Sequence, residues 1–232
     1  MRIYEGMVRE IQWQVGLGRT AWIECPKAAI PAPGRYVMAW SPEDADAPLA
    51  TPLFAARIEA GGFQAAAPIP DAWEPGARLD LRGPLGKGFT PPANLRRLAL
   101  ASLDENLAHL LPLMQHALEQ EAAVALFTDQ ALTNLPSAVE ANPLEVLQEA
   151  LTWADYLAVD LPPQAIPELS RLLEVKRVGG ALPCPAQALV HQIMPCGALA
   201  GCGACAVETR LGWKLACNDG PVFDLIDLLP KG

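Results

Sequence analysis

Residues 194–223 read MPCGALAGCGACAVETRLGWKLACNDGPVF and contain four of the six cysteines of the chain. These are Cys196, Cys202, Cys205 and Cys217, spaced C-x5-C-x2-C-x11-C. The residues between the first three are small, apart from one leucine: Gly197, Ala198, Ala200, Gly201, Gly203 and Ala204. Glycine adopts positive φ angles without steric cost, and small side chains let a backbone approach a bound group closely. The stretch therefore predicts a loop that wraps a compact group held by thiolates.

The cysteine spacing is typical of one kind of metal centre. Plant-type [2Fe–2S] proteins use C-x4-C-x2-C followed by a distant fourth cysteine, and the first gap here is one residue longer. Backbone N–H groups directed at the sulfurs also tune such a centre. We therefore predict that Cys196, Cys202, Cys205 and Cys217 are the four ligands of a [2Fe–2S] cluster.

Two other uses of the cysteines are less well supported. Structural zinc sites usually have two C-x2–4-C pairs, and only Cys202 and Cys205 form one here. Disulfides suit small secreted chains, whereas this chain opens MRIYEGMVREIQW, without the apolar core of an export signal. Cys25 and Cys184 remain, and we expect both to be small, buried hydrophobic side chains. The alternative for Cys184 is a role as a substitute ligand.

Composition limits the partners and the compartment. The 232 residues carry a net charge of −9, which argues against nucleic acid and anionic membranes because both need basic patches. Apolar stretches end well before the ~18 residues that a membrane-spanning helix needs. We expect a cytoplasmic protein without a membrane span.

Hydrophobic periodicity divides the chain into three zones. Residues 1–94 predict a small antiparallel β-barrel, with strands at 7–15, 20–24, 35–40, 53–58 and 78–81 separated by glycine and proline. Residues 95–182 predict a parallel α/β domain: strands at 98–101, 122–127 and 156–159 alternate with a helix starting near Pro112 and helices at 143–153 and 166–173. Residues 183–232 form the [2Fe–2S] segment, with a helix at 186–193 and a hairpin at 208–216 that delivers Cys217. The predicted fold class is thus multidomain, β plus α/β.

The three histidines do not predict a ligand set. His109 and His116 lie seven residues apart, near one helical face, where a surface or satisfied core position is the expectation. His191 precedes the first cluster cysteine by five residues, but a Rieske-type centre needs two histidine ligands and four cysteines make them unnecessary.

Three further motifs carry a resemblance to a known family. They are PGRYVM at 33–38, RGPLGKGF at 82–89 and CNDGPVF at 217–223. With the order barrel, α/β domain, cysteine segment, the chain resembles the electron-transfer subunit of class B dihydroorotate dehydrogenase, among the ferredoxin–NADP reductase-like proteins. The resemblance implies FAD in the barrel, a nicotinamide nucleotide on the α/β domain, and a cluster that serves a partner subunit.

Two motifs of that family are missing. Its Arg-Pro-x-Ser motif, in which the arginine pairs with the FAD pyrophosphate, corresponds to LATPLFA at 49–55. Its second flavin-contacting segment has no clear match in GFQAAA at 62–67, and Arg57 is expected on a solvated face. The Gly-rich turn that admits a dinucleotide pyrophosphate is replaced by SLDEN at 102–106, with the carboxylates of Asp104 and Glu105.

These departures narrow the predicted function. We expect an iron–sulfur subunit that relays single electrons to or from a partner redox subunit, a flavoprotein or dehydrogenase, within a hetero-oligomer or homodimer. NAD(P)H binding is not expected, and FAD binding is left open. The alternatives are a functional FAD-containing NAD(P)H reductase subunit and a non-catalytic assembly subunit with a structural cluster or zinc.

Overall fold

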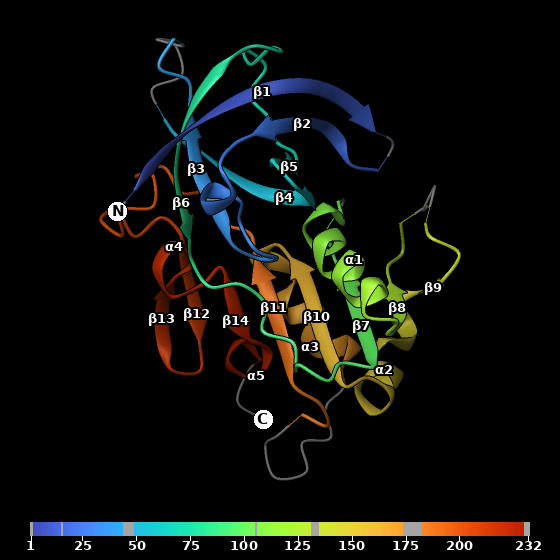
Figure 1. Ribbon diagram of the computed structural model, residues 1–232. Helices are drawn as coiled ribbons and strands as arrows, with labels where there is room; N and C mark the ends of the chain where they lie inside the picture. Colours follow the sequence, from blue (N-terminus) through green and yellow to red (C-terminus); the bar gives the residue numbers. More distant parts are fainter. Residues whose placement is uncertain are drawn as a thin grey trace.

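The N-terminal part of the molecule is a closed barrel (Figure 1). The computed structural model describes residues 2–14, 16–43, 49–104, 106–130, 135–173 and 182–229. The barrel strands are β1 (Ile3–Gln14), β2 (Gly18–Glu24), β3 (Tyr36–Trp40), β4 (Thr51–Glu59), β5 (Gly62–Ala65) and β6 (Arg78–Leu85), in the order β1-β2-β5-β4-β3-β6. Every pairing is antiparallel. Alternate side chains such as Val8, Ile23, Leu53, Phe63 and Leu81 point inward and are fully buried.

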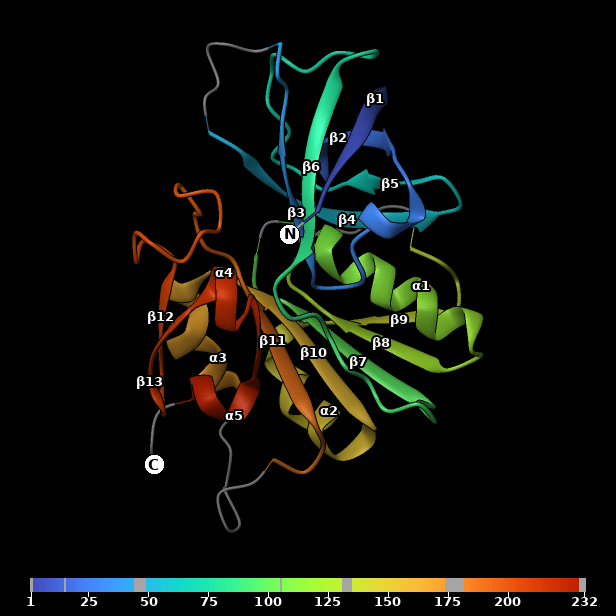
Figure 2. The ribbon, with the colours of Figure 1, turned by 60° about the vertical axis from the view of Figure 1, so that its left-hand side comes forward.

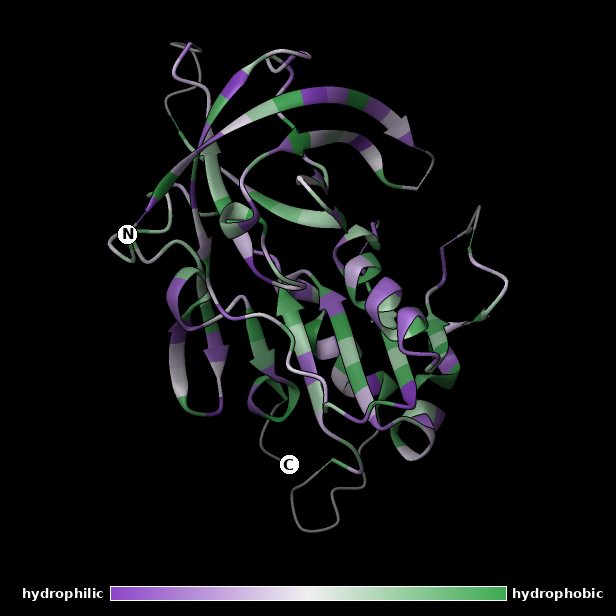
Figure 3. Ribbon diagram, in the orientation of Figure 1, coloured by the Kyte–Doolittle hydropathy of each residue, from purple (hydrophilic) through white to green (hydrophobic). Residues whose placement is uncertain are grey.

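A six-stranded sheet lies below the barrel in Figure 1. Its strands are β7 (Arg97–Ser102), β8 (Ala123–Phe127), β9 (Val139–Asn142), β10 (Tyr156–Leu161), β11 (Ala186–Val190) and β14 (Val222–Asp224), in the order β14-β11-β10-β7-β8-β9. The pairings from β11 through β9 are parallel, and β14 adds an antiparallel edge. The central strands are strongly hydrophobic in Figure 3, as expected for strands covered on both faces.

Helices cover the two faces of this sheet. α1 (Leu111–Glu119) packs on one face and also contacts β4, so it lies between sheet and barrel. α2 (Leu147–Trp153) and α3 (Ile166–Leu172) cover the other face. Successive residues of β10 alternate between these layers, with Leu157 and Val159 toward α2 and α3, and Tyr156 and Ala158 toward α1. The result is a three-layer α/β unit beneath the barrel.

The C-terminal elements close one edge of the molecule. They are the hairpin β12 (Ala206–Thr209) and β13 (Gly212–Leu215), then α4 (Ala216–Asp219), β14 and α5 (Leu225–Leu228). The loop at residues 191–205, which precedes the hairpin, lies beside the barrel (Figure 2).

The predicted fold class is confirmed: an N-terminal antiparallel barrel, a parallel α/β sheet with helices, and the C-terminal cysteine segment. α1 begins with Pro112 in its first turn, as expected. The predicted helix at 186–193 is wrong, because these residues contain β11. Its apolar run fits a buried helix and a buried strand equally well, and pairing with β10 and β14 selects the strand.

Other differences are additions to the predicted elements. β5, β9 and β14 were not expected as strands. Residue 15 of the first predicted strand lies outside the described residues. The boundaries 1–94, 95–182 and 183–232 remain predictions; residues 174–181 and 230–232 are also outside the described part.

Within the part of the chain that the structure describes, no helix combines the length and the apolar character needed to cross a membrane.

Candidate metal centre

The C-terminal hairpin brings two of the predicted ligands together. β12 and β13 pair from Ala206 with Leu215 to Thr209 with Gly212. Just beyond this ladder, the N–H of Ala216 donates to the carbonyl of Cys205 at 2.9 Å. Cys205 and Cys217 therefore lie next to each other, and both are buried. The predicted hairpin that delivers Cys217 is confirmed.

The other two predicted ligands lie on a tightly wound loop. Gly197, Ala198, Ala200 and Gly203 have φ angles of 62°, 60°, 57° and 73°. Alanine in this left-handed region is unfavourable by about 1–2 kcal/mol, so two alanines there mark a backbone with a definite shape. Cys202, which follows Ala200 by two residues, is exposed to solvent.

Backbone amides and burial act differently on the four thiols. The N–H groups of Gly201 and Leu199 lower the pKa of Cys196 to about 6. The N–H of Ala204 donates to the Sγ of Cys202 at 3.4 Å. Burial, and then the neighbouring Cys205, raise the pKa of Cys217 to about 11. Amides directed at sulfur are the arrangement expected around an iron–sulfur centre.

Two buried nitrogens of a half-buried arginine also lie beside this loop. Nε and Nη2 of Arg82 in β6 are buried and have no hydrogen-bond partner among the described residues. A Cβ added to Gly197 would lie 3.8 Å from this Nη2. Unpaired guanidinium donors are costly to bury. An anion beside the loop would satisfy them, and a thiolate-ligated [2Fe–2S] cluster is an anion, so the residues present fit that group.

The three motifs that carried the family resemblance meet at this centre. The N–H of Phe89 donates to the carbonyl of Pro33 at 3.0 Å, and the N–H of Lys87 donates to that of Gly220 at 2.6 Å. The buried hydroxyl of Tyr36 donates to the carbonyl of Cys217 at 3.0 Å. The barrel exit, the turn before β3 and the segment after Cys217 thus form one junction.

The structure places the remaining predicted residues outside the junction. Cys25 is buried in the barrel core, and burial raises the pKa of its thiol to about 11. Cys184 is buried as well, and burial raises its pKa. Both behave as the small buried hydrophobic residues that were expected. Arg57 is on a solvated face, paired with Glu59, as expected.

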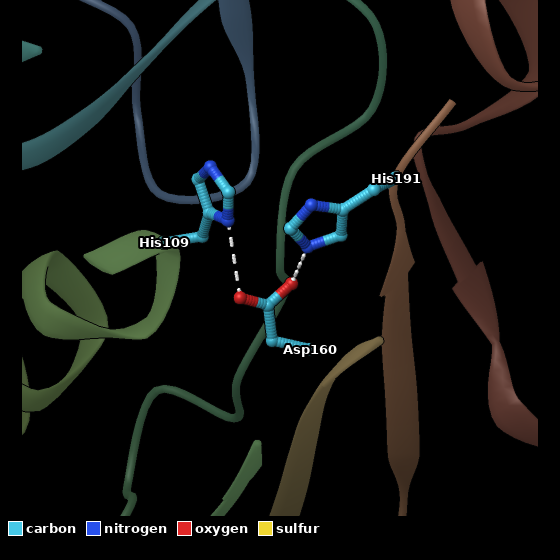
Figure 4. A group of neighbouring side chains, drawn as sticks. All are labelled: His109, Asp160 and His191. Atoms are coloured by element: carbon cyan, nitrogen blue, oxygen red, sulfur yellow. Dashed lines mark hydrogen bonds and ion pairs between the residues drawn. The ribbon is translucent and has the colours of Figure 1, made fainter. Parts of the chain in front are cut away.

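Two histidines meet a buried carboxylate that the sequence analysis missed. Asp160, at the end of β10, is fully buried between His109 and His191 (Figure 4). Burial by itself raises the pKa of Asp160, but the charges of His191 and His109 hold it below its usual range. The signal was an aspartate inside the apolar strand YLAVDL, because a buried carboxylate requires a partner. His109 is thus a satisfied core residue, whereas His116 is exposed.

The backbone groups just before α1, where a dinucleotide would bind, already form hydrogen bonds within the chain. The side-chain oxygen of Asn106 accepts the N–H of Ala108 at 2.7 Å, and its amide donates to the carbonyl of Leu17 at 3.1 Å. Ala108, His109 and Leu110 are buried before α1 begins. Glu105 lies outside the described residues.

Comparisons with known proteins agree with this arrangement. Residues 191–229 match the family model described as the iron-sulfur cluster binding domain of dihydroorotate dehydrogenase B. A curated relative, the electron transfer subunit of dihydroorotate dehydrogenase B (NAD(+)) from Desulforamulus reducens, is 25% identical over 181 residues, covering 65% of each chain. The chain thus spans about two thirds of that relative's length.

Solved structures show the same fold. The NADH-dependent reduced ferredoxin–NADP oxidoreductase structure superposes with a TM-score of 0.71 at 18% identity, covering 96% of this chain and 88% of that one. A ferredoxin NADP+ reductase from Neisseria gonorrhoeae, solved with bound FAD and NADP, gives a TM-score of 0.58 at 11% identity, covering 82% and 99%. Phthalate dioxygenase reductase gives 0.57 at 9% identity, covering 81% and 68%.

Fold and site together define the class: the chain has the fold of ferredoxin reductases, and its residues 191–229 match an iron–sulfur cluster binding domain. Within that class, the chain resembles the electron transfer subunit of dihydroorotate dehydrogenase B.

Proposed function

We propose that this chain is an iron–sulfur electron-transfer subunit. Cys196, Cys202, Cys205 and Cys217 hold a [2Fe–2S] cluster that exchanges single electrons with a partner redox subunit. The observation that carries the proposal is the junction itself: four cysteines lie on a wound loop and a hairpin end, and beside the loop at Gly197 lie two buried nitrogens of Arg82 that have no hydrogen-bond partner among the described residues. The partner is a flavoprotein or a dehydrogenase, in a cytoplasmic hetero-oligomer.

The residues around the cysteines have separate roles in this function. When bound, the cluster supplies a one-electron carrier. Arg82 and the loop amides stabilise negative charge at that position, which favours the reduced state. Tyr36 fixes the backbone at Cys217.

The exposed side of the loop supports docking of a partner there. Cys202 is exposed, and Ile193 and Leu199 on the same loop are 71% and 64% exposed. Exposed apolar side chains of this size are typical of interaction surfaces when they gather. A partner bound over this loop would approach the cluster closely.

The residues at the carboxyl edge of the sheet support the proposal that this chain does not use NAD(P)H. The N–H of Ala108 is engaged by Asn106, and His109 fills the start of α1 against Asp160. Asp104 adds a second carboxylate at the same edge. An anionic pyrophosphate would find the N–H of Ala108 already engaged there and would lie near the carboxylate of Asp104.

An FAD-containing reductase subunit is the second candidate, because the ferredoxin NADP+ reductase with this fold was solved with FAD. An assembly subunit with a structural cluster or zinc is the third.

The first test is an anaerobic absorption spectrum with iron, sulfide, flavin and zinc assayed on the same sample. Two irons and two sulfides per chain without flavin support the proposal. Stoichiometric FAD supports the reductase, and zinc without iron contradicts electron transfer.

Single cysteine variants test the ligand set. Cys202→Ser and Cys217→Ser are expected to lose most of the iron, sulfide and visible absorption. Cys25→Ser and Cys184→Ser are the matched controls, because their thiols are buried elsewhere. Loss of the cluster in Cys184→Ser with retention in one of the four would overturn the assignment.

Reducibility separates electron relay from a structural role. The cluster of the isolated protein is expected to be reduced by dithionite and to return to its oxidised spectrum with a one-electron acceptor. A cluster that resists reduction would favour the assembly subunit.

A further inference from the structure

The second concentration of ligand-type side chains lies at the carboxyl edge of the sheet, away from the cysteines. Asp160 is the only carboxylate of β10 and has no solvent exposure. Its neighbours in the sheet are Ser102 of β7 and Leu189 of β11. Neither carries a positive charge, so the carboxylate must be neutralised from above the sheet.

Two imidazole rings reach this carboxylate from different elements (Figure 4). The Nδ1 of His109, just before α1, lies 3.1 Å from Oδ2 of Asp160. The Nε2 of His191, just after β11, contacts Oδ1. One ligand atom from each residue lies within 4.8 Å of the other two. The side chain of His109 is 7% exposed and that of His191 is 23% exposed.

A second carboxylate lies behind one of the rings. Oδ2 of Asp104 lies 3.7 Å from the Nδ1 of His191, the ring nitrogen that does not contact Asp160. Metal-bound histidines typically direct their other nitrogen at a carboxylate, which fixes the tautomer and orients the ring. A dication at the three residues would be balanced by the charges of Asp160 and Asp104.

We propose that His109, Asp160 and His191 form a binding site for one divalent transition-metal ion of the zinc type. Two imidazoles and a carboxylate are the donor set of open zinc and non-haem iron sites. Imidazole ligands favour such ions over Mg²⁺ and Ca²⁺. The position is the edge at which open α/β sheets bind their ligands. This site is additional to the four cysteines and to the proposed electron relay.

The site is linked to the cysteine junction by aromatic contacts. The ring of His109 lies 4.9 Å from that of Phe54, which lies 5.4 Å from Tyr36. Tyr36 in turn bonds the carbonyl of Cys217. A paramagnetic ion at the histidine site would therefore be close enough to affect the spin relaxation of a reduced cluster.

The test is a titration of the untagged, as-isolated protein with Co²⁺, in which binding is monitored by calorimetry and by visible absorption. We expect one Co²⁺ per chain with weak visible bands of nitrogen and oxygen ligands. Strong near-ultraviolet sulfur-to-cobalt absorption would instead indicate binding at cysteines and would count against the proposal.

Variants assign the binding to the three residues. His109→Gln and His191→Gln are expected to weaken binding at least 100-fold, and Asp104→Asn, acting through His191, about 10-fold. His116→Gln, on the exposed face of α1, is the matched control and should bind like the wild type. Circular dichroism of each variant checks that the fold is intact. Because Asp104 is partly exposed, Asp104→Asn should fold even if a variant of a buried histidine does not, and it then still tests the site.

Two outcomes would overturn the inference: no Co²⁺ binding by the wild type, or equal binding by His191→Gln, Asp104→Asn and the wild type. The three residues would then be a hydrogen-bonded buried ion pair. Where the cluster is present, bound Co²⁺ should also speed the relaxation of its reduced electron-spin signal. A protein without iron and sulfide would refute the proposed relay but leave the titration interpretable.

Discussion

At the scale of single residues, Arg82 has the clearest electrostatic role. Its Nε and Nη2 are buried and have no hydrogen-bond partner in the described part of the chain, and Nη2 lies beside Gly197. A buried guanidinium is tolerated when an anion completes its hydrogen bonds. The charge of a reduced cluster is more negative than that of an oxidised one, so Arg82 should favour reduction.

Arg82→Gln is therefore expected to make the midpoint potential of the cluster more negative. The shift should be on the order of 60 mV, the one-electron equivalent of about 1.4 kcal/mol, close to the contribution of one hydrogen bond from a charged group. A redox titration followed by electron paramagnetic resonance measures it. Arg57→Gln is the control, since Arg57 is exposed and paired with Glu59. Equal potentials for the Arg82 variant and the wild type would contradict the role.

At the scale of elements, the exit of β6 is fitted against the segment after Cys217. Gly86 has a φ of +69°, and a Cβ there would lie 2.7 Å from Cδ of Pro221 and 2.8 Å from the carbonyl oxygen of Gly220. Real Cβ atoms do not approach other atoms this closely, so any larger side chain at residue 86 would push the segment at Gly220 and Pro221 away. The contact holds the barrel exit next to Cys217.

Gly86→Ala is expected to lower the free energy of unfolding by about 3 kcal/mol, combining overpacking with left-handed strain. Gly61→Ala separates the two causes. Gly61 has a φ of +92° but open space around its Cβ position, so strain alone should reduce stability by about 1–2 kcal/mol. Chemical denaturation measures both, and equal losses would show that the contact with Pro221 does not matter.

The turn before β10 provides a pH-dependent contribution. Oδ2 of Asp155 accepts the N–H groups of Arg96 and Arg97 at 3.0 Å each, at the start of β7. The side-chain hydrogen bond from Arg97 is the largest cause that lowers the pKa of Asp155. Because the folded pKa is lowered, this stabilisation is present above the unfolded pKa of about 3.9 and is lost as the pH falls through the folded value.

Asp155→Asn is accordingly expected to lower Tm by a few degrees at pH 7, with the difference from the wild type shrinking below about pH 4. Thermal melts at several pH values measure this. Glu168→Gln, which removes an exposed pair with Arg171, should change Tm little at any pH. A Tm loss that is independent of pH would show that the carboxylate charge is not the cause.

At the scale of the whole molecule, the proposed cluster connects segments that are far apart in the sequence. It would link the loop at Cys196 and Cys202, the hairpin end at Cys205, and α4 at Cys217. These lie against β3 and β6 of the barrel through Tyr36 and Arg82. Metal binding of this kind stabilises the folded state because the unfolded chain lacks the site.

Removal of the cluster is expected to lower Tm by several degrees and to increase proteolysis within residues 197–204. Calorimetry and limited proteolysis of the cluster-containing and stripped forms measure the two effects. Reconstitution with iron and sulfide should reverse both, and an unchanged Tm would mean that the apolar contacts of the junction suffice.

Many local features could be predicted from the sequence. The cysteine spacing with its small residues predicted the wound loop, and Pro112 predicted the first turn of α1. Alternation in the first zone predicted most barrel strands. Each of these depends on neighbouring residues only, through φ preferences, capping and side-chain period. The predicted helix at 186–193 is wrong because the conformation of this segment depends on pairing with β10 and β14, which are distant in sequence or follow later.

By itself, then, the sequence determined the order of barrel, α/β unit and cysteine segment, and the candidate ligands Cys196, Cys202, Cys205 and Cys217. Only the tertiary structure brought Arg82 to the loop, and His109 and His191 to Asp160 across 51 and 31 residues of chain. The physical reason is that spacing specifies local backbone geometry, whereas meetings between distant side chains depend on strand order and register. Burial then makes these contacts obligatory, because a charged group that is removed from solvent needs an opposite charge or a hydrogen-bond partner.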